Sequence, residues 1–446
     1  MRKYRAGLNR EGLMRAVHIL ASLLFCLSTA ALAEDLNWFN ENSYSGHSIR
    51  MLENGEALHA ARLELIKSAK RSIYLAAYAI ENDGAGAEIA DLLCEKAKQG
   101  LEVRLMINNR SSKSFTVQSF RLKTCGAVVF HYSAEMINLP FSLHEKLLIA
   151  DGVRMITGGS GYTDFYNHAS RTSHLDKSKL EPWYDLDFEV IGPSSCYFHR
   201  KFQWNWIYSG NYGLSSIPDL YTPPNANSSP EFQATHQDKF TPCEPTAIDS
   251  SQSISAIPIF NNPLFTKERP ILDAHVKAID ASEGSKTSDI KIYSPYFLPP
   301  TPYIEALLRA RKKGINVTVL TNSPESNDEG FKVSITVGTI KLSKELLAAG
   351  VKIYLWANKS TMHRKGAIYG SDLVFFGSDN IDLRSQEYES DNVIFTNDQA
   401  INMQMGADFD HDLEGATLMT EEYIRQFNKK AGWFQKLIYN MVGKYF

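Results

Sequence analysis

The chain has 446 residues, of which 43% are hydrophobic and 22% are charged, and it carries a formal net charge of -3 at pH 7. This length and balance allow two sizeable hydrophobic cores, so we expect two globular domains. A mildly acidic chain is a poor general binder of nucleic acid, because the polyanionic backbone favours basic surfaces. No window of about 20 apolar residues predicts a membrane-spanning helix.

The first element is an N-terminal segment with the three parts of a secretory signal. Five basic residues between positions 2 and 15 precede the apolar stretch 16–27, and Ala31-Leu32-Ala33 supplies small residues where a signal peptidase cleaves. We predict that residues 1–33 are a signal peptide and that the protein is exported to the periplasm or cell envelope, or secreted. An uncleaved anchor is the alternative, although the apolar stretch is shorter than a membrane span needs.

Each half of the remaining chain alternates strands and helices in the same order. In the first half the pattern predicts a strand, an amphipathic helix and a second strand at 72–78, 84–99 and 101–107. In the second half the same series recurs at 289–294, 302–313 and 315–321. Gly100 and Gly314 close the two helices. This order predicts an α/β fold in duplicate, with parallel sheets covered by helices.

Residues 209–253 separate the two halves. They are rich in Ser, Pro, Asn and Thr and show no sustained periodicity, so we predict a loosely packed linker. The N-terminal domain would then span residues 34–208, and the C-terminal domain would span residues 254–446.

Four cysteines remain once the predicted signal is removed. Cys94, Cys125, Cys196 and Cys243 do not have the spacing of a metal site. In an oxidising compartment they could form one or two disulfides, but the sequence does not reveal which pairs form. Four buried free thiols are the alternative.

The last element is a tail at residues 431–446, in which apolar pairs recur every four residues beside lysines. This pattern predicts an amphipathic helix that lies in a membrane interface, with its lysines drawn to anionic lipid. A helix docked on the core of the protein itself is the alternative.

One short pattern occurs twice in the chain. It consists of His-x-Lys followed, fourteen residues after the His, by Gly and a small residue: His144, Lys146 and Gly158-Gly159, then His363, Lys365 and Gly377-Ser378. All matched positions are offset by 219 residues, which indicates two copies of one half. Each His-Lys pair begins an apolar run typical of a strand, and a spacing of two places both side chains on one face.

The chemistry of this pattern points to an anionic substrate. A nucleophilic imidazole beside an ammonium group is useful when the Lys binds the anion that the His attacks. A solvent-exposed polar face explains one copy equally well, but two copies in identical register favour a catalytic site.

These residues resemble the phospholipase D superfamily, whose signature is H-x-K-x4-D followed by G-[GS]-x-[NS]. The finer resemblance is to bacterial cardiolipin synthases of the C type, through the D-L-D-x4-G-P run at residues 185–193. It covers nearly all of the chain from about residue 55 to the end. It implies two phospholipase D-like α/β/α halves related by a pseudo-two-fold, with the active site at their interface.

The resemblance also implies roles for individual residues. His144 would be the nucleophile that forms a phosphohistidine, and His363 the general acid and then base, although symmetry leaves the reverse assignment open. Lys146 and Lys365 would hold the nonbridging oxygens. Hydrogen bonds to the phosphate would come from Asn380, Ser378 and Ser160, and no metal or other cofactor is needed.

Carboxylates would orient the two histidines. The resemblance assigns Asp185 to the His of the first half and Asp391 to the His of the second, with Asp187 and Glu389 as the alternatives. The acid of the His-x-Lys motif is Asp151, which we place with the catalytic residues although an odd spacing from Lys146 would turn it away as support.

The sequence departs from the family pattern at two positions. Gly161 stands where Asn is expected in the first half. In the second half Gly370 stands where the motif Asp is expected, and Asp372, two residues later, is a possible displaced motif acid.

The expected function is therefore phosphatidyl transfer on a phospholipid substrate at a membrane surface. Water as acceptor would instead make the protein a phospholipase D that produces phosphatidic acid. A nuclease and a non-catalytic lipid-binding protein are the remaining alternatives. One chain carries both motifs, so a monomer suffices and the oligomeric state is not predicted.

Overall fold

The computed structural model describes residues 37–134, 140–167, 182–215, 240–248, 254–282, 289–327, 332–356, 358 and 360–430. The predicted signal at 1–33 and the predicted tail helix at 431–446 lie outside the described residues. The chain divides into two compact units, residues 1–42, with helix α2 (Asn37–Asn42), and residues 43–446. Among the described residues, none of the helices has both the length and the apolar character that a membrane crossing requires.

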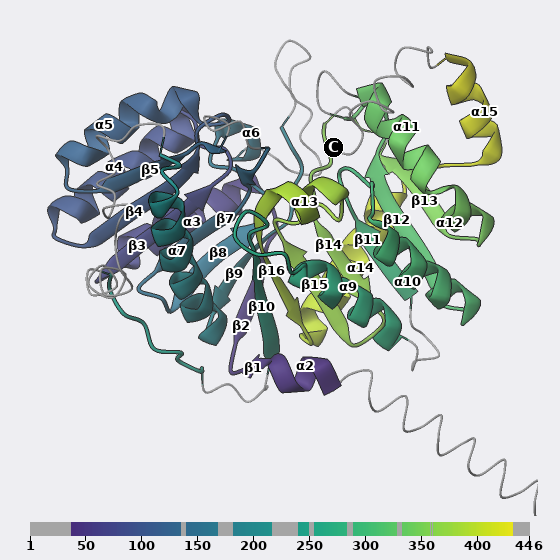
Figure 1. Cartoon of the computed structure of the whole chain (residues 1–446), viewed down its shortest axis with the longest axis horizontal. Helices are drawn as coiled ribbons and strands as arrows, with labels where there is room; N and C mark the ends of the chain where they lie inside the picture. Colours follow the sequence, from purple (N-terminus) through teal and green to yellow (C-terminus); the bar gives the residue numbers. More distant parts are fainter. Residues whose placement is uncertain are drawn as a thin grey trace, which may run out of the picture. The chain divides into compact units, whose positions relative to one another are not determined.

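The first half is built on a seven-stranded sheet (Figure 1). Its strand order is β2 (Ser48–Leu52), β9 (Asp187–Ile191), β8 (Arg154–Gly158), β7 (Lys146–Ala150), β3 (Ser72–Ala77), β4 (Glu102–Asn108) and β5 (Val128–Tyr132). The helices are α3 (Gly55–Ser68), α4 (Gly84–Lys98), η1 (Lys113–Phe115), α5 (Thr116–Thr124), α6 (Asp164–Asn167) and α7 (Pro193–Asn211).

The second half is built on a ten-stranded sheet. Its main path is β1 (Tyr44–Ser45), β10 (Ser255–Asn261), β16 (Glu389–Thr396), β15 (Leu373–Gly377), β14 (Gly366–Tyr369), β11 (Asp289–Tyr293), β12 (Asn316–Asn322), β13 (Lys352–Trp356) and β17 (Thr417–Leu418), and β6 (Ser142–Leu143) pairs with β16. The helices are α9 (Pro270–Ala281), α10 (Thr301–Lys312), α11 (Lys332–Leu342), α12 (Lys344–Ala348), α13 (Leu383–Tyr388), α14 (Gln399–Leu413) and α15 (Glu421–Lys430).

Seven strands of each sheet match one for one. The order β2-β9-β8-β7-β3-β4-β5 in the first half corresponds to β10-β16-β15-β14-β11-β12-β13 in the second. Matched neighbours also have the same relative direction, so the predicted duplication of an α/β half is confirmed.

The expectation of parallel sheets holds for only part of each sheet. Parallel pairing is confined to β3-β4-β5 and to β11-β12-β13, and the other matched pairs are antiparallel. The cause is local, because β7 and β8 are joined by the short turn 151–153, and so are β14 and β15 by 370–372. A tight turn joins antiparallel strands, whereas a parallel pair needs a long crossover.

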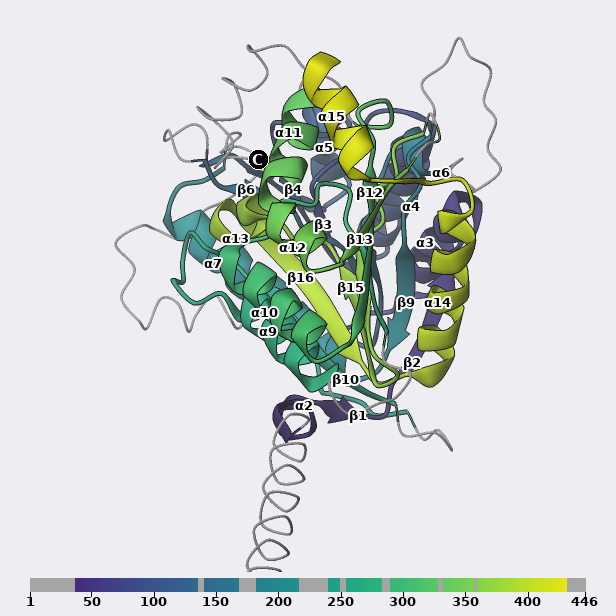
Figure 2. The same ribbon diagram turned by 90° about the vertical axis from the view of Figure 1, so that its right-hand side faces the viewer.

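Alternating side chains bury both faces of the first sheet. Ile73 and Leu75 of β3 pack in one core with α3 and α4, whereas Tyr74 and Ala76 pack in another with α7. Figure 2 shows the matching layers of the second half, with α9 and α10 on one face of its sheet and α14 on the other. Each half is therefore a three-layer α/β/α structure, as expected from the two-residue period of a strand.

The two halves share one core. Phe188 of β9 stacks on Phe376 of β15 with ring centroids 3.8 Å apart, and the surrounding cluster contains residues from both sheets. This shared burial explains why residues 43–446 form one compact unit and places the ends of β7 and β14 within reach of each other.

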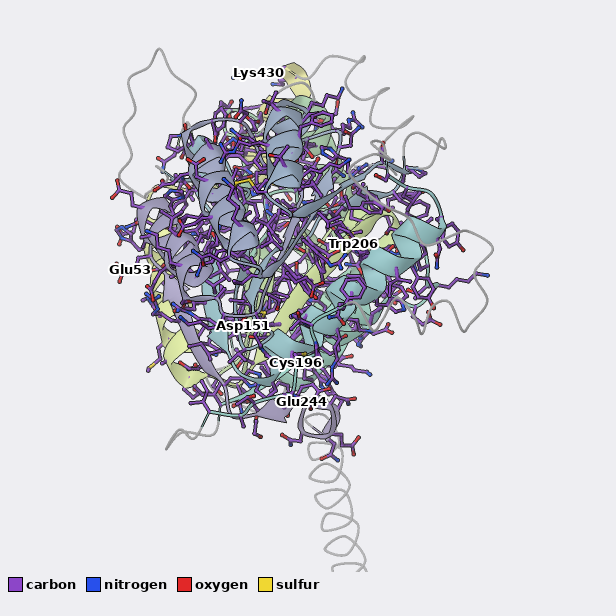
Figure 3. The ribbon with its side chains drawn as sticks, turned by 90° about the vertical axis from the view of Figure 1, so that its left-hand side faces the viewer. Glu53, Asp151, Cys196, Trp206, Glu244 and Lys430 are labelled. Atoms are coloured by element: carbon purple, nitrogen blue, oxygen red, sulfur yellow. A yellow bond between two sulfur atoms is a disulfide. The ribbon has the colours of Figure 1, made fainter. Side chains whose placement is uncertain are left out.

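The linker prediction needs correction where the structure describes it. Helix α7 continues to Asn211, and the described part at 240–248 is held against it rather than loosely packed. Phe240 is buried, and Cys243 forms a disulfide with Cys196. Figure 3 labels Cys196 and Glu244, the residue that follows Cys243 in the chain. A second disulfide joins Cys94 to Cys125, so the four cysteines pair rather than remain free thiols.

Candidate active site

The repeated motif places both His-Lys pairs at the starts of matched strands. Strand β7 begins at Lys146, two residues after His144, and β14 begins directly after Lys365, two residues after His363. All four side chains are buried, with exposed fractions of 5% or less. Buried ionisable groups in such numbers are typical of a functional site, because their desolvation is unfavourable unless a ligand or partner compensates it.

A short parallel backbone pairing between the halves brings each histidine to the other half. Strand β6 pairs with β16, and the N–H of His144 donates to the carbonyl oxygen of Ser390 at 3.0 Å. In the matching bridge Tyr184 pairs with Met362, and the N–H of His363 donates to the carbonyl oxygen of Tyr184 at 2.7 Å. Each histidine is thus fixed one residue away from an acid of the opposite half.

The orienting acids consequently cross between the halves. Nδ1 of His144 lies 2.8 Å from Oδ1 of Asp391, and Nδ1 of His363 lies 2.6 Å from Oδ2 of Asp185. We call this arrangement the crossed pairing. The assignment of Asp185 and Asp391 to the His of their own half was wrong, because the backbone bridges join the halves. With Nδ1 engaged, Nε2 of His144 is left to react, whereas Nζ of Lys365 lies 2.8 Å from Nδ1 and 3.0 Å from Nε2 of His363.

Glu389 is a second carboxylate beside His144. Its Oε2 lies 3.4 Å from Nδ1 of His144, and its Oε1 accepts from Nε of Arg384 at 2.7 Å. Burial raises the pKa of Glu389, but the charge that His144 carries when it is protonated and the charge of Arg384 outweigh this effect and hold that pKa below its usual value. In the sequence analysis Glu389 was named as an alternative and Arg384 was missed, although Arg384 follows shortly after the Gly377-Ser378 pair of the second motif.

The two lysines crowd each other in the site. Nζ of Lys146 donates to the carbonyl oxygen of His144 at 2.7 Å, and Nζ of Lys365 donates to that of His363 at 2.8 Å. Burial, followed by the charge of Lys365, lowers the pKa of Lys146 to about 7. Two ammonium groups that oppose each other in a buried site are suited to share an anion.

Burial in the site favours the neutral form of both imidazoles. Burial lowers the pKa of His144 and of His363 well below the usual value; Glu389 partly offsets this at His144, and the neighbouring lysines lower the pKa of both rings further. Burial also raises the pKa of Asp185 and of Asp391 to about 6. A neutral imidazole has the lone pair that nucleophilic attack requires.

The predicted serines hold acids in this structure. Oγ of Ser378 donates to Oδ1 of Asp391 at 2.6 Å, the same oxygen that faces His144. Oγ of Ser160 donates to Asp187, and that carboxylate therefore supports a loop and does not orient a histidine. The adjacent acids thus engage both hydroxyls in this structure, and their contact with the phosphate stays a prediction.

Asn380 and Gly159 fit the site differently. Oδ1 of Asn380 is buried and has no hydrogen-bond partner among the described residues, so it is available to a ligand. A Cβ atom at Gly159 would collide with the carboxylate of Asp185. The lack of a side chain at Gly159 therefore leaves room for this orienting acid.

Asp151 is a structural residue, not a catalytic one. It lies beyond the far end of β7, roughly 16 Å from Lys146 for five residues of extended strand. Its carboxylate accepts the backbone N–H groups of Lys70, Arg71 and Ser72 at 2.7 to 2.9 Å. Figure 3 labels Asp151.

The second half does not replace Asp151. Asp151 has a left-handed backbone with φ 57°, and its counterpart Gly370 has φ 66°, a conformation that glycine adopts without strain. Asp372 is exposed and accepts a hydrogen bond from the adjacent Ser371 at 3.1 Å. Its interpretation as a displaced motif acid was therefore wrong.

Aromatic rings that the sequence did not predict surround His363. The ring centroids of Trp183, Tyr166 and Tyr296 lie 4.7, 5.9 and 6.3 Å from that of His363. On the other side, the ring of Tyr78 lies 4.9 Å from His144 and 5.0 Å from Nζ of Lys146. No periodic signal in the sequence could have placed these rings, since they come from loops and from the four-residue helix α6.

One group of side chains has the composition of a metal site. Ligand atoms of His144, Glu389 and Asp391 lie within 4.8 Å of one another. However, Arg384 and Ser378 already donate to these two carboxylates, and Lys146 adds a positive charge nearby. A cation there would compete with those donors, so the arrangement is better suited to binding an anion.

Comparison with known proteins agrees with this geometry. The family model described as "Cardiolipin synthase, PLD-like domain" matches residues 63–170 and 276–413. A cardiolipin synthase of Clostridium perfringens (strain 13 / Type A) is 26% identical over 407 residues, which cover 89% of this chain and 76% of the relative. Cardiolipin synthase 1 of Staphylococcus epidermidis is 28% identical over 382 residues, covering 84% of this chain and 70% of the relative.

A solved structure has the same fold. The phosphatidylserine synthase of Haemophilus influenzae Rd KW20 matches with a TM-score of 0.66 and 14% identity, and the match covers 93% of this chain and 99% of that one. At this identity the likeness shows the shared fold.

Proposed function

The chain belongs to the cardiolipin synthase, PLD-like domain family, and from this premise we propose that it is a phosphatidyltransferase that uses a phosphohistidine. The observation that carries the proposal is the buried pair of imidazoles, each held at Nδ1 by an acid of the opposite half, with a lysine of its own half beside each. This set supplies a nucleophile, a proton donor and neutralisation of charge for one phosphodiester.

The first step transfers the phosphatidyl group to the protein. The phosphodiester of a phospholipid such as phosphatidylglycerol binds between Lys146 and Lys365, whose mutual repulsion it relieves. Nε2 of His144 attacks the phosphorus while the bond to the leaving alcohol breaks. Nε2 of His363 gives its proton to that alkoxide, so that glycerol departs and the imidazole of His363 becomes neutral.

The bound anion also prepares His363 for this role. Burial and both lysines lower the pKa of His363 in the site without substrate. A phosphodiester offsets the two ammonium charges, and the pKa of His363 rises so that the imidazolium can form beside Asp185.

The second step moves the phosphatidyl group to an acceptor. His363 removes the proton from the hydroxyl of a second phosphatidylglycerol, whose oxygen attacks the phosphorus and releases His144. The product is cardiolipin. Water in place of the alcohol would give phosphatidic acid through the same intermediate, so hydrolysis is the outcome against which transfer is measured.

We also propose that the protein works outside the cytoplasm at a membrane surface. The two disulfides support export, because such bonds persist in oxidising compartments. The phospholipid substrate supports action at a bilayer, for which the tail at 431–446 remains a predicted anchor.

Lipid mass spectrometry tests the proposal. Protein lacking residues 1–33 is incubated with phosphatidylglycerol vesicles, with and without phosphatidylethanolamine, in the presence of a chelator. Cardiolipin and released glycerol are expected with phosphatidylglycerol alone, and neither is expected from His144→Ala or His363→Ala. Phosphatidic acid as the main product would make the protein a phospholipase D, and cleavage of a plasmid without any lipid turnover would favour a nuclease.

A further inference from the structure

The backbone is strained immediately after Asn380. Ile381 has φ 58°, and in the described part of the chain Asp151 is the other residue besides glycine with positive φ. A left-handed backbone is unfavourable for any L-residue and most of all for a β-branched one. Ile381 is 1% exposed, so it adopts this conformation within the core. Strain of this kind persists where the surroundings hold it, and it often marks a functional loop.

Asp379 supplies that hold. Its Oδ2 accepts the backbone N–H of Ile381 at 3.3 Å and faces Nε2 of His275 at 3.1 Å. Its Oδ1 accepts from Nε2 of Gln386 at 2.8 Å. We call Asp379, His275 and Gln386 the clamp. All three side chains are buried, so water does not compete for these bonds.

Two tyrosines fix the ring of His275. Burial lowers the pKa of His275 to about 3, so the ring is neutral. A neutral ring that donates from Nε2 to Asp379 accepts at Nδ1, and the hydroxyl of Tyr369 lies 2.6 Å from that nitrogen. The hydroxyl of Tyr303 lies 3.3 Å from that of Tyr369. Tyr303 can therefore donate to Tyr369, Tyr369 to His275, and His275 to Asp379.

The clamped turn lies between two groups of the active site. Ser378, one residue before Asp379, donates to Asp391, which in turn holds His144. Asn380, one residue after Asp379, has the buried carbonyl oxygen without a partner among the described residues. A rotation of the turn would therefore move both groups together.

The first half has no such clamp at the matched positions. Ser160 stands where the second half has Asp379, and Tyr162 stands in the place of Ile381. There Arg62 of α3 holds the loop instead, donating to the carbonyl oxygens of Ser160 and Gly161 at 2.8 and 2.7 Å. The strained turn is thus a property of the half whose loop carries Asn380.

We propose that Asp379, held by His275 and Gln386, is a positioning residue that keeps Ile381 left-handed and thereby places Ser378 and Asn380 for the phosphodiester. This inference rests on the proposed function, since the groups that it places belong to that reaction. Asp379 acts through the backbone of the turn and does not touch the reacting atoms.

Relief of the strain provides the test. Asp379→Ala removes both oxygens of the clamp, so the turn is expected to relax. The rate of cleavage of bis(p-nitrophenyl) phosphate should fall about tenfold or more, and the affinity for inorganic sulfate should fall with it. Adding Ile381→Gly should restore most of both losses, because glycine adopts positive φ without strain.

Ile381→Ala is the matched control in the same background. It removes nearly the same side chain as Ile381→Gly but keeps the penalty for positive φ, so it should restore neither quantity. Equal effects of Gly and Ala would overturn the proposal, because lost packing alone would then explain them. If the glycine variant does not fold, Ile381→Asn, which tolerates positive φ, is compared with Ile381→Leu on the same terms.

The two readouts also separate this inference from the proposed function. Sulfate affinity that recovers with Gly and not with Ala supports the clamp even if the protein makes no cardiolipin. Cardiolipin synthesis by the wild type, together with equal behaviour of Gly and Ala, would keep the function and remove the clamp.

Discussion

The two halves repeat the same strands but surround their histidines with different groups. Near Nδ1 of His144 lie the carboxylates of Asp391 and Glu389, whereas Asp185 supplies the carboxylate at His363. Three aromatic rings lie around His363, with Trp183 nearest, and one, that of Tyr78, lies beside His144. The same motif therefore has two carboxylates at its imidazole in one half, and in the other it has one carboxylate, the ammonium group of Lys365 and more aromatic rings.

This difference suggests how a duplicated site acquires two roles. An imidazole that bonds to phosphorus becomes positively charged, and two carboxylates stabilise that charge better than one. The surroundings favour His144 as the nucleophile and leave His363 to exchange protons with alcohols beside aromatic rings. Duplication supplies the reacting groups, and the residues around each copy divide the work between them.

The largest expected effects come from removing the orienting acids. Asp391→Asn should slow phosphorylation of His144 by about 10²- to 10⁴-fold, and Asp185→Asn should slow the proton transfers of His363 by a similar factor. A diester with a p-nitrophenolate leaving group distinguishes the two, because that leaving group needs no general acid. Rapid-mixing measurements of p-nitrophenol release should show recovery in Asp185→Asn and not in Asp391→Asn. The opposite pattern would contradict the crossed pairing.

The two disulfides are a second difference between the first half and the second. The Cys94–Cys125 bond closes a separation of 31 residues and the Cys196–Cys243 bond one of 47. Replacing either pair with serines should lower the free energy of unfolding by about 2–4 kcal/mol, with the larger loss for the longer loop. Guanidinium unfolding measures this change. Identical unfolding of oxidised and reduced wild-type protein would show that the bonds do not form.

Asp151 and Asp372 lie in the matching turns of the two halves, so variants at these positions show whether the two turns depend on their acids to the same degree. Asp151→Asn should lower the free energy of unfolding by about 1–3 kcal/mol, because its carboxylate accepts three backbone N–H groups. Asp372→Asn should change it by less than about 0.5 kcal/mol, because the side chain is exposed. Thermal unfolding of both variants checks the order, and kcat should remain near wild type in each. A large loss of kcat in Asp372→Asn would restore it as a functional acid.

The pH dependence of anion binding tests the proposed anion site, to which each half contributes one lysine. Lys146 has a pKa lowered to about 7 by burial and by Lys365, so it loses its charge as pH rises through 7. Sulfate affinity should be highest below that pH and fall by up to about tenfold per unit above it. Calorimetry at several pH values measures this slope. Lys146→Gln should flatten it, and a wild-type affinity that rises with pH would contradict the role of Lys146.

The sequence was informative where one residue type at one spacing determines the chemistry. Two His-Lys pairs in identical register predicted the duplicated half, the strands that carry the site and the chemistry of an anion. These features depend on contacts within about ten residues, which hydrophobic periodicity reports well.

The predictions that were wrong share a physical cause, because they depend on contacts between residues far apart in the sequence. The partner of His144 is Asp391, 247 residues away, and backbone pairing between the halves selects it over Asp185. The disulfide partners and the rings around His363 are likewise determined by contacts between loops. A turn that joins β7 to β8 also decides strand direction, which apolar runs alone do not encode.

Trapping of the covalent intermediate tests the central claim most directly. Wild type, His144→Ala and His363→Ala are mixed with a p-nitrophenyl phosphodiester, whose leaving group needs no general acid, and denatured in alkali, in which phosphohistidine survives. Mass spectrometry of the peptides then locates the added group. We predict an adduct on His144 that accumulates in His363→Ala, because the acceptor is no longer deprotonated, and is absent from His144→Ala. An adduct on His363 in the His144→Ala protein, with none on His144 in the His363→Ala protein, would contradict the account.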